Sequence, residues 1–330
     1  MPEVLLVLAT STGGVGRHVQ SLAAGLAERF TVTVAAPAST LAAFDLARGI
    51  EVEIGGRPHP ARDARALGVL RALAARADLV HAHGLRAGAL AVLTPGPVVV
   101  TLHNAVDGRL SGVLERLVAR RARVVLAASD DLADRARALG ARDVRPGPVG
   151  APALVATGRD PGLGHPLVLA VGRLHPQKGY DVLLAALPQW PEAVVAVAGV
   201  GPLAAELQAA GPSVRWLGAR DDVADLLAAA DVVVLPSVWE ARSLTAQEAM
   251  RAGRPLVATA AGGTPGLVRD GAVLVPPGDA VALGAAVRAL LDDPAAAAAL
   301  GQRAQAVAAT LTTEQDTVAQ VAALYEELLR

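Results

Sequence analysis

Two glutamates, Glu240 and Glu248, carry the clearest chemical signal in this chain. They follow an apolar run typical of a buried strand, Val232–Leu235, and a break at Pro236–Ser237, and Glu248 falls inside a helix predicted over Leu244–Ala252. The first turn of a helix presents backbone N–H groups that suit a phosphate. A carboxylate deeper in the helix can accept hydrogen bonds from a sugar diol. The pattern predicts a site for a sugar–diphosphate ligand. Taken alone, this segment would have the same pattern if it were an ordinary strand–loop–helix connection with two solvated glutamates.

Two cations, Arg173 and Lys178, fall in the loop after a strand predicted over Leu167–Val171, and Gly179 opens the next helix. Two positive charges at the carboxyl end of a strand can neutralise a diphosphate without a metal ion. The chain contains no Asp-x-Asp pair, which could chelate a divalent ion on a diphosphate. We therefore expect no metal and no cofactor, only a nucleotide-type substrate.

Composition limits the class of protein. A chain of 330 residues suits two domains of ordinary size. Its net charge of −1 and aromatic content of 2% argue against nucleic acid as a partner. Cysteine is absent, which excludes disulfides and thiolate metal sites. Met1–Thr10 lacks a basic leader and is predicted as a core strand rather than a signal peptide, so we expect a cytoplasmic protein.

Short runs of Val and Leu alternate with helical patterns, which predicts an α/β fold of two doubly wound, Rossmann-like domains with parallel sheets. The strands expected in the first half are Val4–Ala9, Thr31–Ala36, Val52–Ile54, Leu79–Ala82, Val98–Leu102 and Val124–Ala128. Those expected in the second half are Leu167–Val171, Ala193–Ala198, Val214–Leu217, Val232–Leu235, Leu256–Thr259 and Val273–Val275. The first loop is expected over Thr10–Gly16, with a helix over Arg17–Arg29.

A stretch rich in Gly and Pro, residues 151–166, has little periodicity and is predicted as a linker. It would separate an N-terminal domain, residues 1–150, from a C-terminal domain, residues 167–311. A final helix over residues 312–330 carries apolar side chains at helical spacing, with Thr312 or Thr313 as its N-cap.

Together these motifs resemble the large retaining glycosyltransferase family usually numbered four, the group 1 glycosyl transferases. The resemblance covers nearly the whole chain through an ordered set of segments: Gly13–Val15, Asp78–His83, Thr101–Asn104, Val171–Leu174, Gln177–Gly179, Ala198–Pro202, Leu217–Gly218, Ala230–Ser237, the two-glutamate segment and Gly262–Gly263. It implies the GT-B architecture, in which two Rossmann-like domains face each other across a cleft and close on the donor. It also implies that the last helix returns to the N-terminal domain.

The resemblance implies roles in the second domain. Arg173 and Lys178 would hold the donor diphosphate, and the backbone around Ser243–Thr245 would meet the phosphates. Glu248 would accept from the nucleotide ribose. Glu240 would contact hydroxyls of the donor sugar, which makes it a candidate catalytic residue.

In the first domain, Gly13 and Gly14 would let the N-terminal loop approach the donor because they lack a Cβ atom. His103 would lie near the reacting sugar and is the second candidate catalytic residue, with a histidine satisfied by neighbouring backbone as the alternative. His83 is interpreted as structural or as an acceptor-side contact, and His18 as a weaker candidate.

The reaction implied is metal-independent transfer with retention at the anomeric carbon, from a donor of the UDP-sugar or GDP-mannose type. The departing phosphate would take the proton of the acceptor, and cations and helix ends would stabilise it. The acceptor, small or lipid-linked, is unidentified. A basic stretch, Val113–Val125, suits either a solvated helix face or peripheral contact with an anionic membrane.

Two departures leave the donor open: Ala241–Ser243 stands where the family often has Gly-Phe-Gly, and Thr264–Gly266 stands where it often has Pro–Glu. A sugar-nucleotide epimerase of the same architecture and a non-catalytic sugar-nucleotide binder are alternatives. So is a nicotinamide dehydrogenase, since Gly199–Ala204 fits a Gly-x-Gly-x-x-Ala fingerprint and Asp221 or Asp222 follows.

Overall fold

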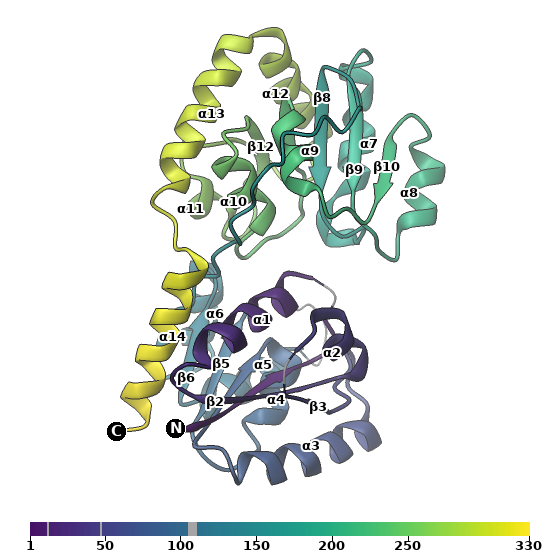
Figure 1. The fold of residues 1–330 in the computed structure, drawn as a ribbon. Coiled ribbons are helices and arrows are strands. Elements are labelled where there is room, and N and C mark those ends of the chain that lie inside the picture. Colours follow the sequence, from purple (N-terminus) through teal and green to yellow (C-terminus); the bar gives the residue numbers. More distant parts are fainter. Residues whose placement is uncertain (12, 47, 105–110) are drawn as a thin grey trace. The chain divides into compact units, whose positions relative to one another are not determined.

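The computed structural model describes the whole chain except residues 12, 47 and 105–110 (Figure 1). The chain divides into two compact units, residues 1–150 with 312–330, and residues 151–311. Each unit holds one sheet whose paired strands run parallel, with helices connecting them. The predicted α/β class with parallel sheets is confirmed.

The sheet of the first unit has the strand order β3-β2-β1-β4-β5-β6-β7. Its strands are β1 (Glu3–Leu8), β2 (Thr31–Ala36), β3 (Gly49–Glu51), β4 (Leu79–His83), β5 (Val98–Leu102), β6 (Val124–Ala127) and β7 (Val144–Pro146). Its helices are α1 (Gly14–Leu26), α2 (Ala38–Phe44), α3 (Pro60–Ala74), α4 (Leu85–Ala91), α5 (Ser111–Arg121), α6 (Asp130–Ala138) and α14 (Glu314–Leu328). The chain order reverses between β1 and β4, which makes this the switch point of the sheet.

The core of the first unit has two layers because side chains along a strand alternate between the faces of a sheet. In β1, Leu6 and Leu8 join the apolar cluster with α1 and α14, whereas Leu5 and Val7 join the cluster with α3 and α4. Apolar side chains on both faces explain why β1 reads as a continuous apolar run after Glu3.

Helix α14 is part of the first unit. A capping box starts it: the Thr313 hydroxyl accepts from the Asp316 N–H, and the Asp316 carboxylate accepts from the Thr313 N–H. It packs along α1 so closely that a Cβ on Gly25 would lie 2.7 Å from a Val318 methyl. Tyr325 is completely buried. This helix, at the end of the chain, therefore completes the core of a unit whose first strand lies at the start of the chain.

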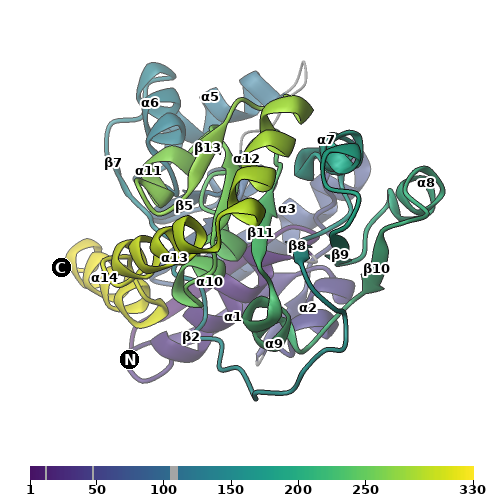
Figure 2. The same cartoon turned by 90° about the horizontal axis from the view of Figure 1, so that it is seen from above.

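The sheet of the second unit has the order β10-β9-β8-β11-β12-β13, and Figures 1 and 2 both show β8, β9 and β10 side by side. Its strands are β8 (Leu167–Val171), β9 (Val194–Ala198), β10 (Arg215–Gly218), β11 (Val232–Leu235), β12 (Leu256–Thr259) and β13 (Val273–Val275). Its helices are η1 (Pro176–Lys178), α7 (Tyr180–Ala186), η2 (Leu187–Gln189), α8 (Ala204–Ala210), α9 (Val223–Ala229), α10 (Leu244–Arg251), α11 (Thr264–Val268), α12 (Ala280–Asp292) and α13 (Pro294–Ala308). The order reverses between β8 and β11.

Some predicted elements were wrong. The third strand lies at Gly49–Glu51 rather than Val52–Ile54, because Val52 and Ile54 are buried by packing after the strand has ended. Helix α1 begins at Gly14, inside the predicted loop. The sequence reading did not identify α2, β7 or α11.

Candidate functional site

The sequence-predicted donor residues lie at the switch point of the second sheet. Arg173 and Lys178 follow β8, whereas Glu240 and helix α10 follow the neighbouring strand β11. In an open parallel sheet, ligands bind outside the carboxyl ends of the strands where the order reverses. Topology thus brings two separate sequence motifs to one edge of one unit.

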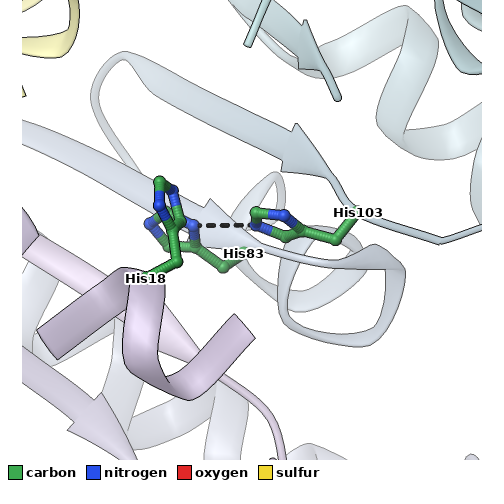
Figure 3. Close-up of side chains that lie close together, drawn as sticks. All are labelled: His18, His83 and His103. Atoms are coloured by element: carbon green, nitrogen blue, oxygen red, sulfur yellow. Dashed lines mark hydrogen bonds between the residues drawn. The ribbon is translucent and has the colours of Figure 1, made fainter. Parts of the chain in front are cut away.

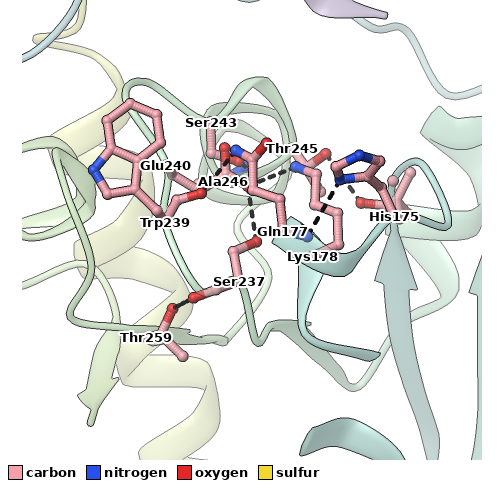
Figure 4. A network of polar contacts seen from close by, with 12 residues as sticks. His175, Gln177, Lys178, Ser237, Trp239, Glu240, Ser243, Thr245, Ala246 and Thr259 are labelled. Carbon is pink, nitrogen blue, oxygen red and sulfur yellow. Dashed lines mark hydrogen bonds and ion pairs between the residues drawn. The ribbon is translucent and has the colours of Figure 1, made fainter. Parts of the chain in front are cut away.

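The loop after β8 packs directly on the loop after β11. Gly179 has a left-handed backbone (φ +62°), and a Cβ there would lie 2.1 Å from the Pro236 carbonyl oxygen, so only glycine fits. The Gln177 carbonyl accepts from the Val238 N–H at 2.8 Å, and the Gln177 side chain donates to the Trp239 carbonyl at 2.8 Å (Figure 4). These bonds hold the loops of both motifs at a fixed separation.

Lys178 and Glu240 form an ion pair at the centre of this network (Figure 4). Lys178 Nζ lies 2.6 Å from Glu240 Oε1, and the side chains are 21% and 9% exposed. The Ser237 hydroxyl donates to the same oxygen at 2.8 Å, and Thr259 donates to the Ser237 carbonyl. Burial and then the negative charge of Glu240 raise the pKa of Tyr180. The carboxylate of Glu240 is therefore fixed in position by a cation and a hydroxyl.

The loop after β8 is electropositive. Arg173 is exposed there, beside the partly buried Lys178. The pKa of His175 is lowered, first by burial and then by the charges of Arg173 and Lys178. Two cations in one loop after a strand could both act on a diphosphate.

Helix α10 turns its N-terminus toward the same loops. Ser243 is its N-cap and accepts from the Ala246 N–H at 3.2 Å. The Thr245 hydroxyl donates to the Val171 carbonyl at 3.3 Å, which ties the first turn, with Leu244, to the end of β8. Glu248 lies one turn further on and is 8% exposed. A helix start tied to the end of the strand that precedes Arg173 and Lys178 is an arrangement that can bind an anion.

Sequence reasoning missed three residues of this network. Ser237 could have been found, because a hydroxyl in the short loop before a buried carboxylate is a natural donor to it. Gln177 and Trp239 meet through a side chain and a carbonyl in different loops, and no spacing in the sequence signals that contact.

The glycines of the dehydrogenase fingerprint have a structural explanation. A Cβ on Gly199 would lie 1.9 Å from the Gly172 carbonyl oxygen, and one on Gly201 would lie 2.2 Å from the Leu174 carbonyl oxygen. The loop after β9 packs against the loop after β8, which accounts for both glycines without a dinucleotide.

In the first unit, Gly13 is the N-cap of α1 and Gly14 is its first residue. A Cβ on Gly13 would meet nothing within 4 Å, so packing in this unit does not require glycine there. Gly16 is different, because a Cβ there would lie 2.0 Å from the Phe44 ring.

His103 follows β5 and meets two other histidines, His83 at the end of β4 and His18 in α1 (Figure 3). His83 Nδ1 lies 3.2 Å from His103 Nε2, and the two rings are nearly parallel, with centroids 5.4 Å apart. The His18 ring centroid lies 5.2 Å from that of His103 and 5.4 Å from that of His83. The structure thus joins the predicted catalytic histidine to the two weaker candidates.

These rings are neutral at pH 7. Burial lowers the pKa of His18 to about 4. The pKa values of His83 and His103 fall well below 6.5, chiefly through burial and then through their neighbours. Beside them, His81 bonds the Tyr325 hydroxyl through Nδ1 and the Thr101 hydroxyl through Nε2, each at 2.6 Å. His81 therefore has two protein partners.

The predicted basic stretch, Val113–Val125, lies mostly in helix α5, but the helix ends at Arg121 and Val124 and Val125 belong to β6. In the part of the chain that the structure describes, no helix has both the length and the apolar character that crossing a bilayer requires.

Comparisons with known proteins agree with this geometry. A family model described as "Glycosyltransferase Family 4" matches residues 12–150, and one described as "Glycosyl transferases group 1" matches residues 165–293. Glycogen synthase of Mycobacterium tuberculosis is 33% identical over 276 aligned residues, and the match covers 73% of this chain and 66% of that protein. A 2-deoxystreptamine N-acetyl-D-glucosaminyltransferase of Streptomyces fradiae is 33% identical over 262 aligned residues, and the match covers 63% of this chain and 61% of that protein. The chain thus spans about two thirds of these relatives.

Solved structures share the fold over the full length. The Anabaena protein Alr3699/HepE, solved with UDP and glucose, superposes with a TM-score of 0.85 at 21% identity over 99% of this chain and 100% of that one. Sucrose-phosphate synthase from Thermosynechococcus elongatus gives 0.81 at 22% identity over 99% of each chain. The fold is GT-B, and the chain belongs to glycosyltransferase family 4, the group 1 glycosyl transferases.

Proposed function

We propose that the protein transfers a sugar from a nucleotide-diphosphate donor to an acceptor. The observation that carries the proposal is the Lys178–Glu240 ion pair, held between an electropositive loop and the start of α10 at the switch point of the second sheet. Family membership supports it. A similar fold has been solved with UDP-glucose, which supports a donor of the UDP-sugar type, with GDP-mannose as the other candidate.

Each part of the site has a proposed task. Arg173 and Lys178 bind the diphosphate, together with the N–H groups in the first turn of α10. Glu248 accepts from the ribose diol. Glu240 accepts from hydroxyls of the donor sugar, and its oxygen is oriented for this by Lys178 and Ser237.

The proposed reaction retains the anomeric configuration and uses no metal. The bond from the anomeric carbon to the diphosphate oxygen breaks, and the acceptor oxygen bonds to the same face of that carbon. The diphosphate takes the acceptor proton, so charge and atoms balance. The cations stabilise the leaving group as its charge develops. His103 contributes to binding the reacting sugar, with Gly13 and Gly14 leaving space for the donor.

We predict that the two glutamates recognise different parts of the donor. Glu248→Gln should weaken binding of the bare nucleoside diphosphate by about tenfold, because the ribose loses a charged acceptor worth roughly 1.5 kcal/mol. Glu240→Gln should leave that binding nearly unchanged and impair binding of the intact sugar nucleotide. Isothermal titration with both ligands measures the difference, and equal losses for the bare nucleotide would contradict the assignment.

Transfer is also expected to survive removal of divalent ions. Excess EDTA should leave the rate within about twofold, because side-chain cations and a helix start replace the metal at the diphosphate. The rate is measured with a sugar nucleotide before and after chelation. Loss of activity that magnesium or manganese restores would show that the side-chain cations and the helix start do not replace a metal ion at the diphosphate.

The function itself is tested in two steps. A thermal-shift screen of nucleotides and sugar nucleotides identifies the donor, since a ligand that binds only the folded state raises the melting temperature. Turnover of that donor with candidate acceptors is then followed by product analysis. Glycosylated acceptor supports transfer, an isomerised sugar indicates an epimerase, and binding without turnover indicates a non-catalytic binder.

A further inference from the structure

We propose that His18, His83 and His103 form a binding site for a divalent transition ion of the zinc class. Among the described residues, these three are the histidines whose ligand nitrogens gather within 4.8 Å of one another, and all three side chains are buried. They come from α1, from the end of β4 and from the residue after β5, so the fold brings them together. The site goes beyond the proposed transfer reaction, which requires no metal.

The spacing of two of the rings already suits a tetrahedral ion. Zinc binds imidazole nitrogen at about 2.0–2.1 Å, and two such nitrogens on one tetrahedral ion stand about 3.3 Å apart. His83 Nδ1 and His103 Nε2 are 3.2 Å apart. In the metal-free protein one ring donates a hydrogen bond to the other. Binding needs the tautomers in which both facing nitrogens are bare, and each ring keeps its proton on its other nitrogen.

No neighbour blocks the tautomer that an ion needs at His83. His83 Nε2 is buried and has no partner among the described residues. Since no donor occupies Nε2, that nitrogen can carry the proton and leave Nδ1 bare for the ion. His81, in the same strand, has a hydroxyl on each nitrogen, so both of its nitrogens are already taken.

One ring of the cluster, that of His18, borders a cavity within the first unit. The cavity has a volume of about 460 Å³, and His18 lies on its wall with residues of β5, β6, β7 and α14. Three imidazoles and no carboxylate or thiolate suit zinc, nickel or copper rather than magnesium or calcium, which prefer oxygen. Three protein ligands also leave a fourth position open.

Metal binding to the full-length protein, purified without a histidine tag and stripped with chelator, tests the proposal. Titration should show one Zn²⁺ per chain, and Co²⁺ should give the visible absorption bands of a tetrahedral nitrogen-ligated ion. Mg²⁺ should not bind at this site. The measurement uses no sugar nucleotide, so its outcome is independent of the proposed transfer.

Three variants locate the site. His18→Asn, His83→Asn and His103→Asn should each weaken Zn²⁺ binding by at least about tenfold, the scale seen even for partners outside the ligand set. His59→Asn is the matched control, because His59 caps α3 and Asn can take over that role, so affinity should not change. Unchanged affinity in all three variants, or an equal loss in the control, overturns the proposal. For any variant that does not fold, anomalous scattering from zinc-soaked crystals of the unaltered protein decides: a zinc peak among the three rings supports the site, and its absence overturns it.

Discussion

Tyr325→Ala is expected to destabilise the first unit by about 3–5 kcal/mol, the range for removal of a large buried aromatic side chain. The Tyr325 ring is fully buried and forms a T-shaped pair with the Phe30 ring, with ring centroids 5.4 Å apart. Its hydroxyl also bonds His81 at 2.6 Å. Tyr325→Phe should cost less, about 1–3 kcal/mol, because it removes only the hydroxyl and leaves one His81 nitrogen unpaired.

Tryptophan fluorescence can show whether the loss of stability is confined to the first unit. All three tryptophans, Trp190, Trp216 and Trp239, lie in the second unit. Circular dichroism in a urea titration should therefore show an earlier transition in Tyr325→Ala, while tryptophan fluorescence should keep its midpoint. Gln320→Ala, at an exposed position of α14, is the control and should stay within about 0.5 kcal/mol. A Tyr325→Ala variant as stable as this control would mean that α14 does not belong to the core of the first unit.

Buried parallel strands were the most predictable part of the fold. The predicted bounds of β2, β5, β8, β11, β12 and β13 are those observed. Most residues of these strands are buried, and the strands read as short runs of Val, Leu and Ala that only threonine interrupts. The edge strand β3 is exposed along its length and gives no such run. The strand was therefore predicted at the apolar residues just after it, Val52–Ile54.

The site was predictable where a residue's place on the sheet determines its neighbours. Arg173 and Glu240 follow strands that pair side by side, so their motifs had to share an edge once the sheet order was known. The histidine cluster could not be predicted in this way. His18 comes from a helix, and its approach to His83 and His103 depends on how α1 packs on the sheet, which no local spacing encodes.

The electropositive loop is the part of the site where a single substitution should most affect donor binding. Arg173→Ala and Lys178→Ala should each weaken binding of a nucleoside diphosphate by about 1.5–3 kcal/mol, the scale of hydrogen bonds to charged groups. Lys178→Ala should lie at the upper end, because it also leaves Glu240, a carboxylate 9% exposed, without its cation. That carboxylate would then repel the diphosphate.

A double variant separates these two effects. Lys178→Ala combined with Glu240→Gln should bind the bare nucleoside diphosphate more tightly than Lys178→Ala alone, because the repelling charge is gone while the lost phosphate contact stays lost. Isothermal titration at two salt concentrations measures this, and Arg215→Ala, an exposed cation of β10, should leave affinity unchanged. If Arg173→Ala and Lys178→Ala bind as tightly as the unaltered chain, the diphosphate is held elsewhere and the assignment of this loop is wrong. If the double variant binds no better than Lys178→Ala, the charge of Glu240 does not affect binding of the phosphates. The ion pair would then contribute only to binding of the donor sugar.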